Sequence, residues 1–413
     1  MEWDIFFAIS QTPAAGVIPD EAKMYENFFE QVEAADRLGF GVAWIAESHL
    51  SSEVQKGNSH PVIPHWKGEV GLNVDFLQLS QHIFRRTRHI ETGSAVMNIL
   101  CNGGPIAAAE RVAAFVALHG LDPAERRRIH VGFAAGRFDF MNRAAGIVPR
   151  DAVEEAAWPA LKGKIFAESS EIFLRLLRGE VLRSDQVRST SLCRADFRSD
   201  EDWSRVLEAA GRADEPAETV TLDVLRRWTF EDLKIIPQDW RRELLQLIIG
   251  SHDPTLQEEV NRYLPVQVFN LSITRPEIVE DTHKRLSVAY HTDGGIWRRS
   301  YMPRTTFVFL NEEPELSLTE RRAAARQESQ QALGAYWTAL EGTLDPKKVE
   351  NAAENALVGN AEDVAEQILE RFHPEDRLML WFDFFNHDCD RVISNMENFM
   401  GKVRPLVEKR LQA

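Results

Sequence analysis

The sequence predicts an α/β fold, a (β/α)₈ TIM barrel with a helical insertion at about residues 180–260. Strand-like and helix-like segments alternate along the first third of the 413 residues, which is typical of parallel strands joined by helices. Eight strand-like runs can be counted in the whole chain, the number that such a barrel needs. No Asn-Gly or Asp-Gly turn joins two of these runs directly, so an antiparallel meander fits less well. An open parallel sheet stays an alternative on these observations alone.

The first two predicted strands flank a helix. An apolar run at residues 3–9 predicts the first strand. Residues 21–38 carry apolar side chains at helical spacing, and Gly39 follows them as a typical C-terminal stop. Residues 42–46 form a continuous apolar run, which is typical of a strand buried on both faces. Polar residues begin directly after this run, at the carboxyl end of the strand.

The same alternation continues beyond this unit. Residues 89–100 predict a third strand, and Pro105 follows at the first position of a helix expected over 106–118. Residues 128–136 predict a fourth strand that ends in glycine. The remaining four strands are expected at residues 265–271, 286–290, 305–310 and 378–385.

The middle of the chain has a different character. Residues 180–260 are dense in charge and hold no run with a period of two, whereas residues 203–210 and 240–249 look helical. A structureless loop of that length is improbable in a compact domain. We therefore expect one barrel domain over residues 1–413, within which the insertion acts as a lid or a packing module.

Composition excludes several classes of function. Lysine and arginine number 48 against 64 acidic residues, so the net charge is −16 and the isoelectric point is near 5.3. Such a charge repels phosphate backbones and anionic lipid, so no nucleic acid and no membrane surface is expected as a partner. The 44% hydrophobic content is that of an ordinary globular protein.

Cysteine usage and the first residues indicate a cytoplasmic protein. Cys101, Cys193 and Cys389 lie far apart without CxxC spacing, so neither a disulfide framework nor a metal site is expected. The amino-terminal residues are acidic where a secretory peptide needs basic ones. No apolar run reaches the roughly 18 to 20 residues that cross a bilayer.

One segment combines hydroxyl and guanidinium groups with a helix start. Ser272, Thr274 and Arg275 come directly after a predicted strand, and Pro276 can open the next helix. Free N–H groups at a helix start favour a phosphate, which two hydroxyls and a guanidinium would help to hold. An ordinary Ser/Thr helix cap is the structural alternative.

Two further strand ends are candidates for a site. Residues 132–136 place two alanines between two glycines, which lets a flat ring or a phosphate approach the backbone, although a plain strand-to-loop turn is the alternative. Glu47, Ser48 and His49 form the polar tip of the second strand, where a barrel presents catalytic groups. His49 is the best acid–base candidate and Glu47 an acceptor that orients it, and both have a structural alternative as hydrogen-bonded loop residues.

Other polar residues are weaker candidates. His60 and His65 lie in a proline-rich loop without a carboxylate or thiol at ligand spacing, so we expect them to face solvent rather than hold a metal. Cys101 has no acid–base partner near it in the sequence. The end of the eighth predicted strand carries polar side chains that can face the site, with a solvated loop as an equal alternative, namely Asp383, Asn386, His387 and Asp388.

Six segments, taken in order, resemble the bacterial luciferase-like flavin-dependent monooxygenase family. The resemblance covers residues 1 to about 150 and 265 to 405 and skips the insertion. The segments are GFGVAWIAESHL, TGSAVMNILCNGGPIAAAERVA, VGFAAGRFDF, LSITRPEIVED, VGNAEDVAEQI and LMLWFDFF. That family has a (β/α)₈ barrel, in agreement with the strand count.

The resemblance implies a cofactor and the residues that hold it. It implies reduced FMN that reacts with dioxygen to form a peroxyflavin, which oxygenates a small organic substrate. A non-prolyl cis peptide is implied between Ala95 and Val96. The implied cofactor contacts are Ser94, Ala95 and Val96 along the ring, Ala134, Ala135 and Gly136 beside it, and Ser272, Thr274 and Arg275 at the phosphate.

The resemblance also has limits. The family often reads Glu-His-His at the end of the second strand, and this chain has Ser48 in place of the first histidine, so light emission is not implied. The sequence shows no GxGxxG segment for a nicotinamide cofactor, so a separate flavin reductase is expected to supply the reduced FMN. The resemblance also implies a homodimer. Hydride transfer with a deazaflavin and a non-catalytic barrel subunit remain alternatives.

Overall fold

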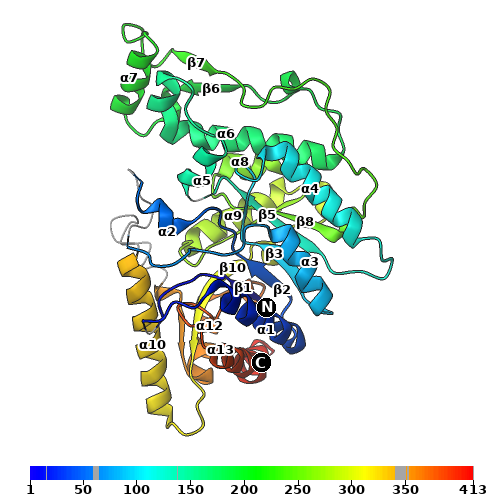
Figure 1. The fold of residues 1–413 in the computed structure, drawn as a ribbon, viewed down its shortest axis with the longest axis vertical. Helices are drawn as coiled ribbons and strands as arrows, with labels where there is room; N and C mark the ends of the chain where they lie inside the picture. The colour runs from blue at the N-terminus through cyan, green and yellow to red at the C-terminus, as the bar shows by residue number, and fades with distance from the viewer. Residues whose placement is uncertain (15, 59–64, 137, 340–349, 351–352, 413) are drawn as a thin grey trace.

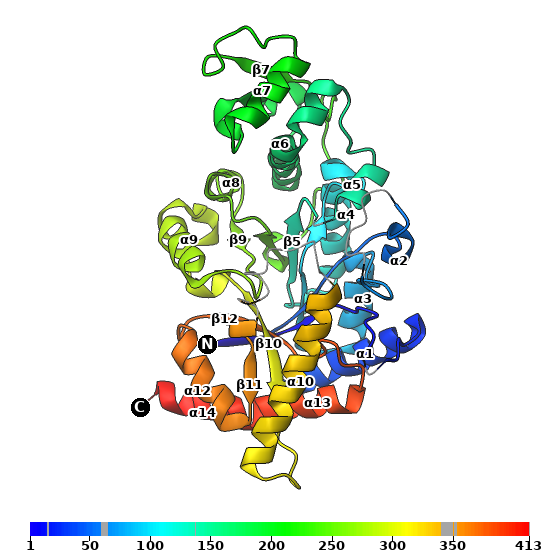
Figure 2. The same cartoon turned by 90° about the vertical axis from the view of Figure 1, so that its left-hand side faces the viewer.

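The computed structural model describes residues 1–14, 16–58, 65–136, 138–339, 350 and 353–412. These residues form an α/β fold around a curled parallel sheet (Figures 1 and 2). The strands follow one another in the sheet as β11-β10-β12-β1-β2-β3-β5-β8-β9, and β4 pairs with β5 beside this path. The α/β class and the parallel sheet are as the sequence predicts.

Ten strands make up this sheet in the described part of the chain. Most of them are short and buried on both faces, which continuous apolar runs allow. Their bounds are β1 Glu2–Phe7, β2 Val42–Ile45, β3 Glu91–Ser94, β4 Met97–Asn98, β5 Ile129–Ala134, β8 Leu245–Ile249, β9 Val266–Val268, β10 Arg304–Leu310, β11 Leu357–Gly359 and β12 Arg377–Trp381.

The curl of the sheet brings its two sides towards each other. Asn270, two residues beyond β9, makes an isolated parallel bridge with Arg304 at the start of β10. The amide of Asn270 donates to the carbonyl of Pro303 at 3.0 Å, and the amide of Thr305 donates to the carbonyl of Asn270 at 3.1 Å. These two hydrogen bonds join the segment just after β9 to the start of β10.

Helices join the parallel strands and cover the outside of the sheet (Figure 2). Helix α1 shows why they begin and end where they do: the Asp20 side chain accepts from the Lys23 amide at its start, and Gly39, with φ 85°, ends it. The helices are α1 Glu21–Leu38, α2 Ser52–Gln55, α3 Phe76–Arg86, α4 Gly104–His119, α5 Asp139–Ala144, α6 Ala152–Arg178, α7 Asp200–Ala209, α8 Pro254–Val260, α9 Pro276–Ala289, α10 Leu318–Ala339, α12 Ala361–Arg371, α13 Cys389–Asn398 and α14 Arg404–Leu411.

None of the helices in the described ranges combines the length and the apolar character that a bilayer crossing requires.

Two predictions of secondary structure are wrong. Residues 286–290, expected to be a strand, form the last turn of α9 and the residue after it, because the helix that Pro276 opens continues further than expected. Residues 240–249, expected to be helical, contain β8, which lies between β5 and β9. A short apolar run fits a helix or a buried strand equally well by periodicity alone. For the main sheet, the count of eight strands therefore included one false strand and missed two, β8 and β11, whereas β4 falls inside the third predicted strand.

The stretch expected to be a helical insertion is only partly helical. Strands β6 (Thr190–Cys193) and β7 (Thr221–Val224) form a separate antiparallel pair, and α7 lies between them in the chain. A small core that includes Trp203 and Leu161 packs this unit against α6. Figure 1 shows β6, β7 and α7 at the upper end, apart from the main sheet. The later part of the expected insertion, β8 and α8, belongs to the main fold.

Candidate active site

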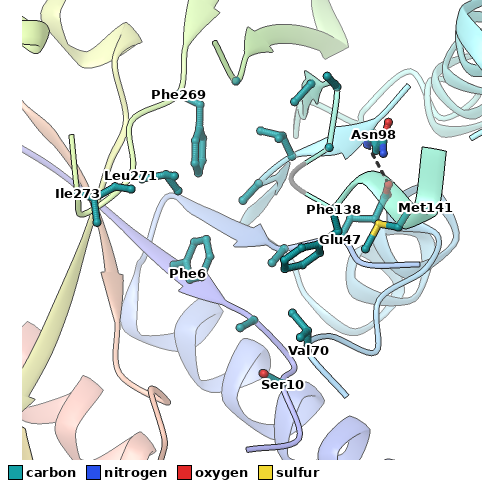
Figure 3. Close-up of a pocket in the computed structure, with 18 of the residues that line it drawn as sticks. Phe6, Ser10, Glu47, Val70, Asn98, Phe138, Met141, Phe269, Leu271 and Ile273 are labelled. Atoms are coloured by element: carbon teal, nitrogen blue, oxygen red, sulfur yellow. Dashed lines mark hydrogen bonds between the residues drawn. The ribbon is translucent and has the colours of Figure 1, made fainter. Parts of the chain in front are cut away.

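A cavity of about 690 Å³ opens where the main strands end. Residues at or just beyond the carboxyl ends of β1, β2, β3, β5, β8, β9 and β12 line it. Figure 3 shows Phe6 and Phe269 entering this space from the sheet, with Phe138 and Met141 on another side. Its size lies within the roughly 300–1,000 Å³ typical of sites for small molecules. The end of the sheet is the one where α/β proteins bind ligands.

Aromatic rings form much of the cavity wall. The rings of Phe6 and Trp381 lie 4.5 Å apart between centroids, and those of Phe307 and Trp381 lie 5.0 Å apart. Further aromatic residues along the wall are Trp66, Phe138, Trp158, Phe166, Phe269, Tyr336, Phe384 and Phe385. A wall of this kind favours a flat, largely apolar ligand.

The β3 and β5 side of the cavity has closely packed backbone. The peptide bond between Ala95 and Val96 is cis, as the resemblance implies, and both residues line the cavity. Gly132 of β5 approaches this segment so closely that an added Cβ would lie 2.2 Å from the Ser94 carbonyl oxygen. Ser94 itself is fully buried and is not among the lining residues.

The alanine–glycine segment after β5 also faces the cavity. Ala134, Ala135 and Gly136 line it. Gly136 has φ 77°, and a Cβ there would lie 2.1 Å from Nδ2 of Asn98, so glycine is needed for both conformation and space. Nδ2 of the Asn98 side chain donates to Oδ1 of Asn142 at 2.8 Å (Figure 3). The expected close approach of backbone to a ligand is possible here.

The turn between β9 and α9 is held by its own hydrogen bonds. The hydroxyl of Thr274 accepts from the Leu271 amide at 3.0 Å, and the Asn355 side chain donates to the Ser272 carbonyl at 2.7 Å. Ser272 lines the cavity, Thr274 is buried and Arg275 is exposed. The structure therefore brings Ser272 to the cavity, buries Thr274 within the turn and leaves the Arg275 guanidinium at the surface.

The start of α9 has no hydroxyl cap. Arg275 occupies the N-cap position and makes no side-chain cap bond within the described residues, and the Thr274 hydroxyl is used inside the turn. The ordinary Ser/Thr cap, which was the alternative for this segment, is therefore not what forms. Pro276 has no N–H and the Ile278 amide donates to the Arg275 carbonyl at 3.1 Å, so the Glu277 amide is the N–H that the first turn of α9 leaves for an anion.

His252 is a cavity residue that the sequence interpretation missed. It follows β8, and its Nε2 lies 3.2 Å from Oδ1 of Asn270 and 3.5 Å from the Thr274 hydroxyl. The residue keeps an exposed surface, and the partial burial of its ring lowers its pKa more than the hydrogen bond to Asn270 raises it. In the sequence, Gly-Ser-His at residues 250–252 indicates the polar end of a strand only if residues 245–249 are recognised as that strand. Because residues 240–249 also fit a helix, His252 is not predicted as a site residue.

Glu47 and His49 lie together, as predicted for the end of β2. Oε1 of Glu47 is 2.9 Å from Nε2 of His49 and also accepts from the Asn102 side chain at 2.8 Å. Burial lowers the pKa of His49, but hydrogen bonds with Cys101 and Glu47 outweigh it and raise the pKa to about 10. Glu47 lines the cavity, whereas His49 stands behind it.

The expectation that Cys101 lacks an acid–base partner is wrong. Its side chain contacts that of His49, which is 52 positions earlier in the chain. The fold makes this contact by bringing the residues after β4 next to the end of β2. One sequence gives no sign of such a pairing.

The polar residues after β12 divide into two groups. Asp383 and His387 line the cavity, and Nε2 of His387 lies 2.6 Å from the Thr12 carbonyl oxygen. Asn386 and Asp388 lie beyond it, and Asp388 caps α13 by accepting from the Arg391 amide at 3.1 Å.

The histidines of the proline-rich loop give no metal site in the described ranges. His65 is exposed, and His60 lies outside the described residues. Among those residues, no group of three or more histidine, cysteine or carboxylate side chains is placed to hold a metal ion.

Comparison with known proteins identifies a family for the first part of the chain. Residues 1–194 match the sequence model of the family described as luciferase-like monooxygenase. The chain resembles the luciferase-like monooxygenases, as its sequence predicted. No curated protein matches it in sequence.

Solved structures share the fold of this chain over 98% of its length. The monooxygenase RslO1 from Streptomyces bottropensis is 17% identical, covers 98% of this chain and 99% of its own, and has a TM-score of 0.64. The oxygenating constituent of 3,6-diketocamphane monooxygenase from Pseudomonas putida, solved with FMN, is 12% identical, with 98% of both chains covered and a TM-score of 0.55. An F420-dependent secondary alcohol dehydrogenase is 12% identical, with 98% and 99% covered and a TM-score of 0.50. At these identities the likeness shows a shared fold.

Proposed function

We propose that this protein is a flavin-dependent monooxygenase that takes reduced FMN from a separate reductase and uses dioxygen to oxygenate a small organic substrate. The observation that carries the proposal is the cavity at the carboxyl ends of the strands, with the uncapped start of α9 at its edge. Bound reduced FMN would supply the reaction with oxygen. The reductase and a homodimeric assembly rest on the family resemblance.

The residues of this chain fit such a cofactor in three places. Ala95, Val96 and the segment from Ala134 to Gly136 offer backbone and small side chains to a flat ring. Ser94 supports that wall from behind, where it is buried. The turn with Ser272, Thr274 and Arg275 offers a helix start and a guanidinium to a phosphate.

The surrounding groups have roles that follow from their contacts. Glu47 and His49 form a carboxylate–imidazolium pair at the cavity, and the imidazolium can donate a proton or hold Glu47 in place. Aromatic side chains exclude water from the same space. We infer further that the bridge from Asn270 to Arg304 closes the curled sheet into a (β/α)₈ barrel and that β6, α7 and β7 form a unit over the cavity.

Arg275 gives the sharpest test of the cofactor assignment. Because a charge-assisted hydrogen bond contributes about 1.5–3 kcal/mol, Arg275→Ala should weaken binding of reduced FMN by about 10- to 100-fold. Riboflavin, which has no phosphate, should bind the variant and the parent protein equally. Both affinities are measured by anaerobic titration of flavin absorbance.

A matched control separates a local contact from overall charge. Lys284 lies on the same helix and is exposed, so Lys284→Ala removes one positive charge well away from the turn and should leave FMN binding unchanged. Equal losses in the two variants, or an equal loss for riboflavin and FMN, would overturn the phosphate assignment.

Mixing the loaded protein with oxygen tests the class of reaction. The proposal predicts that bound reduced FMN reoxidises with a time course different from that of free flavin and that a substrate gains one oxygen atom from labelled dioxygen. Binding of a deazaflavin in place of FMN would instead favour hydride transfer, the alternative for which an F420-dependent enzyme of the same fold is an example. Absence of binding to either flavin would favour a non-catalytic subunit.

A further inference from the structure

A carboxyl oxygen of Asp383, in the cavity wall, has no hydrogen-bond partner among the described residues. Asp383 lies two residues beyond β12 and lines the cavity. Among the described residues, its Oδ1 is buried and makes no hydrogen bond, and no ion pair involves its side chain. A buried polar group without a partner costs free energy, so each one calls for an explanation.

The neighbours of Asp383 are aromatic rather than charged. Trp381 and Phe384 lie on either side of it in the chain, with their rings 4.9 Å apart between centroids, and the ring of Phe385 lies 5.8 Å from that of Trp66. The Trp381 indole nitrogen is itself buried without a hydrogen bond in the described structure. The indole lies close enough to the Asp383 carboxyl to oppose the rise of its pKa, but the two groups do not meet in hydrogen-bond geometry.

The electrostatic surroundings agree with this geometry. Burial raises the pKa of Asp383 to about 7, against smaller opposite effects of its own backbone and of Trp381, and no charged neighbour contributes. The other titratable side chains that line the cavity are Glu47, Asp139, Lys162, His252, Tyr336 and His387. Several of them are engaged elsewhere: Glu47 with His49, His252 with Asn270, and His387 with Thr12.

The backbone beside Asp383 is held in an unusual conformation. Phe385 has φ 53°, in the left-handed region that bulky residues rarely adopt. Ile9 and Leu50, after β1 and β2, also have positive φ at this end of the sheet. Non-glycine residues in this region cost free energy and cluster at functional sites. The strain therefore coincides with the wall that carries the unpaired carboxyl.

We propose that Asp383 recognises the substrate, a planar aromatic molecule whose phenolic hydroxyl donates a hydrogen bond to this carboxyl group. The proposal rests on the proposed monooxygenase function for the identity of the second ligand in the cavity. Aromatic walls match a flat ring system, and a carboxyl acceptor among the rings matches a hydroxyl donor on such a ligand. A hydroxyl donor supplies the missing partner without bringing a further charge into the apolar wall.

Two other ligands could in principle use the same carboxyl. An organic cation would pair with the carboxylate and lie against the aromatic faces, and a flavin ring carries an N–H donor of its own. The experiment therefore measures all three ligand types on the same protein. The probes are 2-naphthol, its methyl ether 2-methoxynaphthalene, benzyltrimethylammonium and FMN.

The measurement is equilibrium binding of each aromatic probe to the protein loaded with reduced FMN under anaerobic conditions. Quenching of tryptophan fluorescence reports binding, since Trp66 and Trp381 line the cavity. We expect 2-naphthol to bind about tenfold more tightly than its methyl ether. Asp383→Asn should remove most of that preference and leave the methyl ether unchanged. Asp390→Asn, the same change at an exposed position on α13, should leave both affinities as they are.

The dependence on pH gives a second readout that a merely structural role would not move. A carboxylate accepts a hydrogen bond more strongly than a carboxylic acid, and a phenol stays protonated up to about pH 9. The preference for 2-naphthol should therefore increase as the pH rises from 6 to 8 in the parent protein and stay flat in Asp383→Asn.

Each contrary result has a distinct meaning. Equal binding of 2-naphthol and its ether, or tighter binding of benzyltrimethylammonium, overturns the proposal. A loss of FMN affinity in Asp383→Asn, with the naphthol preference retained, also overturns it and assigns the carboxyl to the flavin. If FMN does not bind the parent protein at all, the proposed function fails, and the naphthol preference, measured without flavin, still decides the role of Asp383.

Discussion

The two ends of the sheet treat buried carboxyl groups in opposite ways. Near the amino ends of the strands, Asp4 is fully buried and fully paired: Oδ2 accepts from Arg377 and from the Trp44 indole, each at 2.6 Å, and Oδ1 accepts from the Val42 amide at 3.0 Å. At the carboxyl ends, Asp383 lines a cavity, and its Oδ1 has no hydrogen bond or ion pair among the described residues. A buried carboxyl group therefore has hydrogen-bond partners on both oxygens at one end of the sheet, whereas at the other end one oxygen lacks a partner among the described residues.

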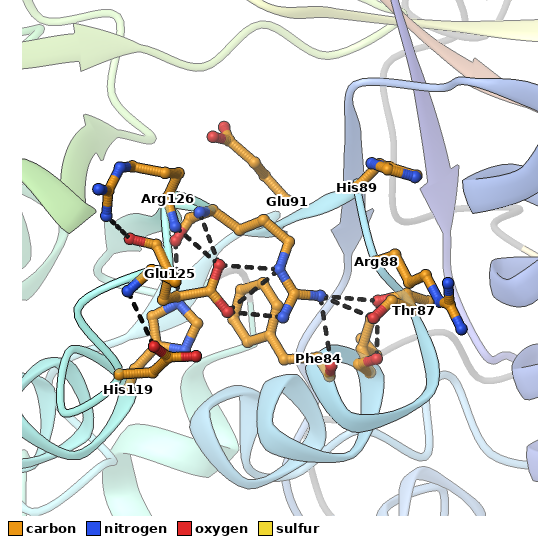
Figure 4. A network of polar contacts seen from close by, with 12 residues as sticks. Phe84, Thr87, Arg88, His89, Glu91, His119, Glu125 and Arg126 are labelled. Carbon is orange, nitrogen blue, oxygen red and sulfur yellow. Dashed lines mark hydrogen bonds and ion pairs between the residues drawn. The ribbon is translucent and has the colours of Figure 1, made fainter.

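Other polar groups at the amino ends follow the first pattern. Glu91, at the start of β3, lies 2.6 Å from His130 and 3.0 Å from Arg128. In the loop before β5, Arg127 pairs with Glu125 at 2.6 Å and donates to the Thr87 carbonyl at 2.9 Å (Figure 4). The carboxyl groups of Glu91 and Glu125, like that of Asp4, are thus paired within the protein, and Asp383 at the other end of the sheet differs from them in this respect.

The largest expected effect comes from removing the buried ion pair between Arg377 and Asp4. Arg377→Met leaves the Asp4 carboxylate buried without its cation, which should lower the free energy of unfolding by about 3–5 kcal/mol. Urea denaturation measures this loss. The matched control is Arg410→Met, which breaks an exposed ion pair with Glu362 and should cost less than about 1 kcal/mol. Similar losses in both variants would contradict the comparison.

At the carboxyl ends of the strands, replacing the Asp383 carboxyl with a neutral amide should stabilise the ligand-free protein. The pKa of Asp383 is raised from 3.8 to about 7, so the folded state binds its proton more tightly than the unfolded state. Its ionisation therefore destabilises the fold increasingly from pH 4 to 7 and fully above 7. Asp383→Asn should gain on the order of 1–3 kcal/mol at pH 8 and nothing at pH 4. Thermal unfolding at the two pH values checks this, and a gain of equal size at both would refute it.

A smaller effect is expected from His49, a paired group beside the cavity. Its pKa is raised to about 10, so its stabilising interaction is complete below the unfolded value near 6.5 and disappears as the pH rises through 10. His49→Gln should cost on the order of 1 kcal/mol at pH 6 and progressively less towards pH 10. His89→Gln, at an exposed position, should show no such trend. A constant difference between His49→Gln and the parent across this range would rule out the imidazolium pair.

Much of the fold could be predicted because its signals are local. The run at residues 42–46 is continuous and apolar, and it forms the buried strand β2. Helix α1 has the predicted bounds because its periodicity is regular and Gly39 ends it. Strand β8 is hard to predict because five residues give no clear period. The last turn of α9 resembles a strand because Leu286, Val288 and Tyr290 alternate with smaller residues.

The candidate site was predictable in part for the same reason. Glu47 and the turn at Ser272 stand at the ends of recognisable strands, and both line the cavity. The contact of Cys101 with His49 and that of His252 with Asn270 join residues distant in the chain. The missing partner of Asp383 was equally invisible, because it is a property of everything packed around the side chain.

The most direct test of the central claim is a crystal structure of the protein grown with reduced FMN under anaerobic conditions. We expect the flavin ring in the cavity, against Ala95, Val96 and Gly136, with its phosphate at the turn formed by Ser272, Thr274 and Arg275. Asp383 should face space that the ring leaves for a second ligand. A flavin bound elsewhere, or one whose phosphate lies away from the start of α9, would contradict the account.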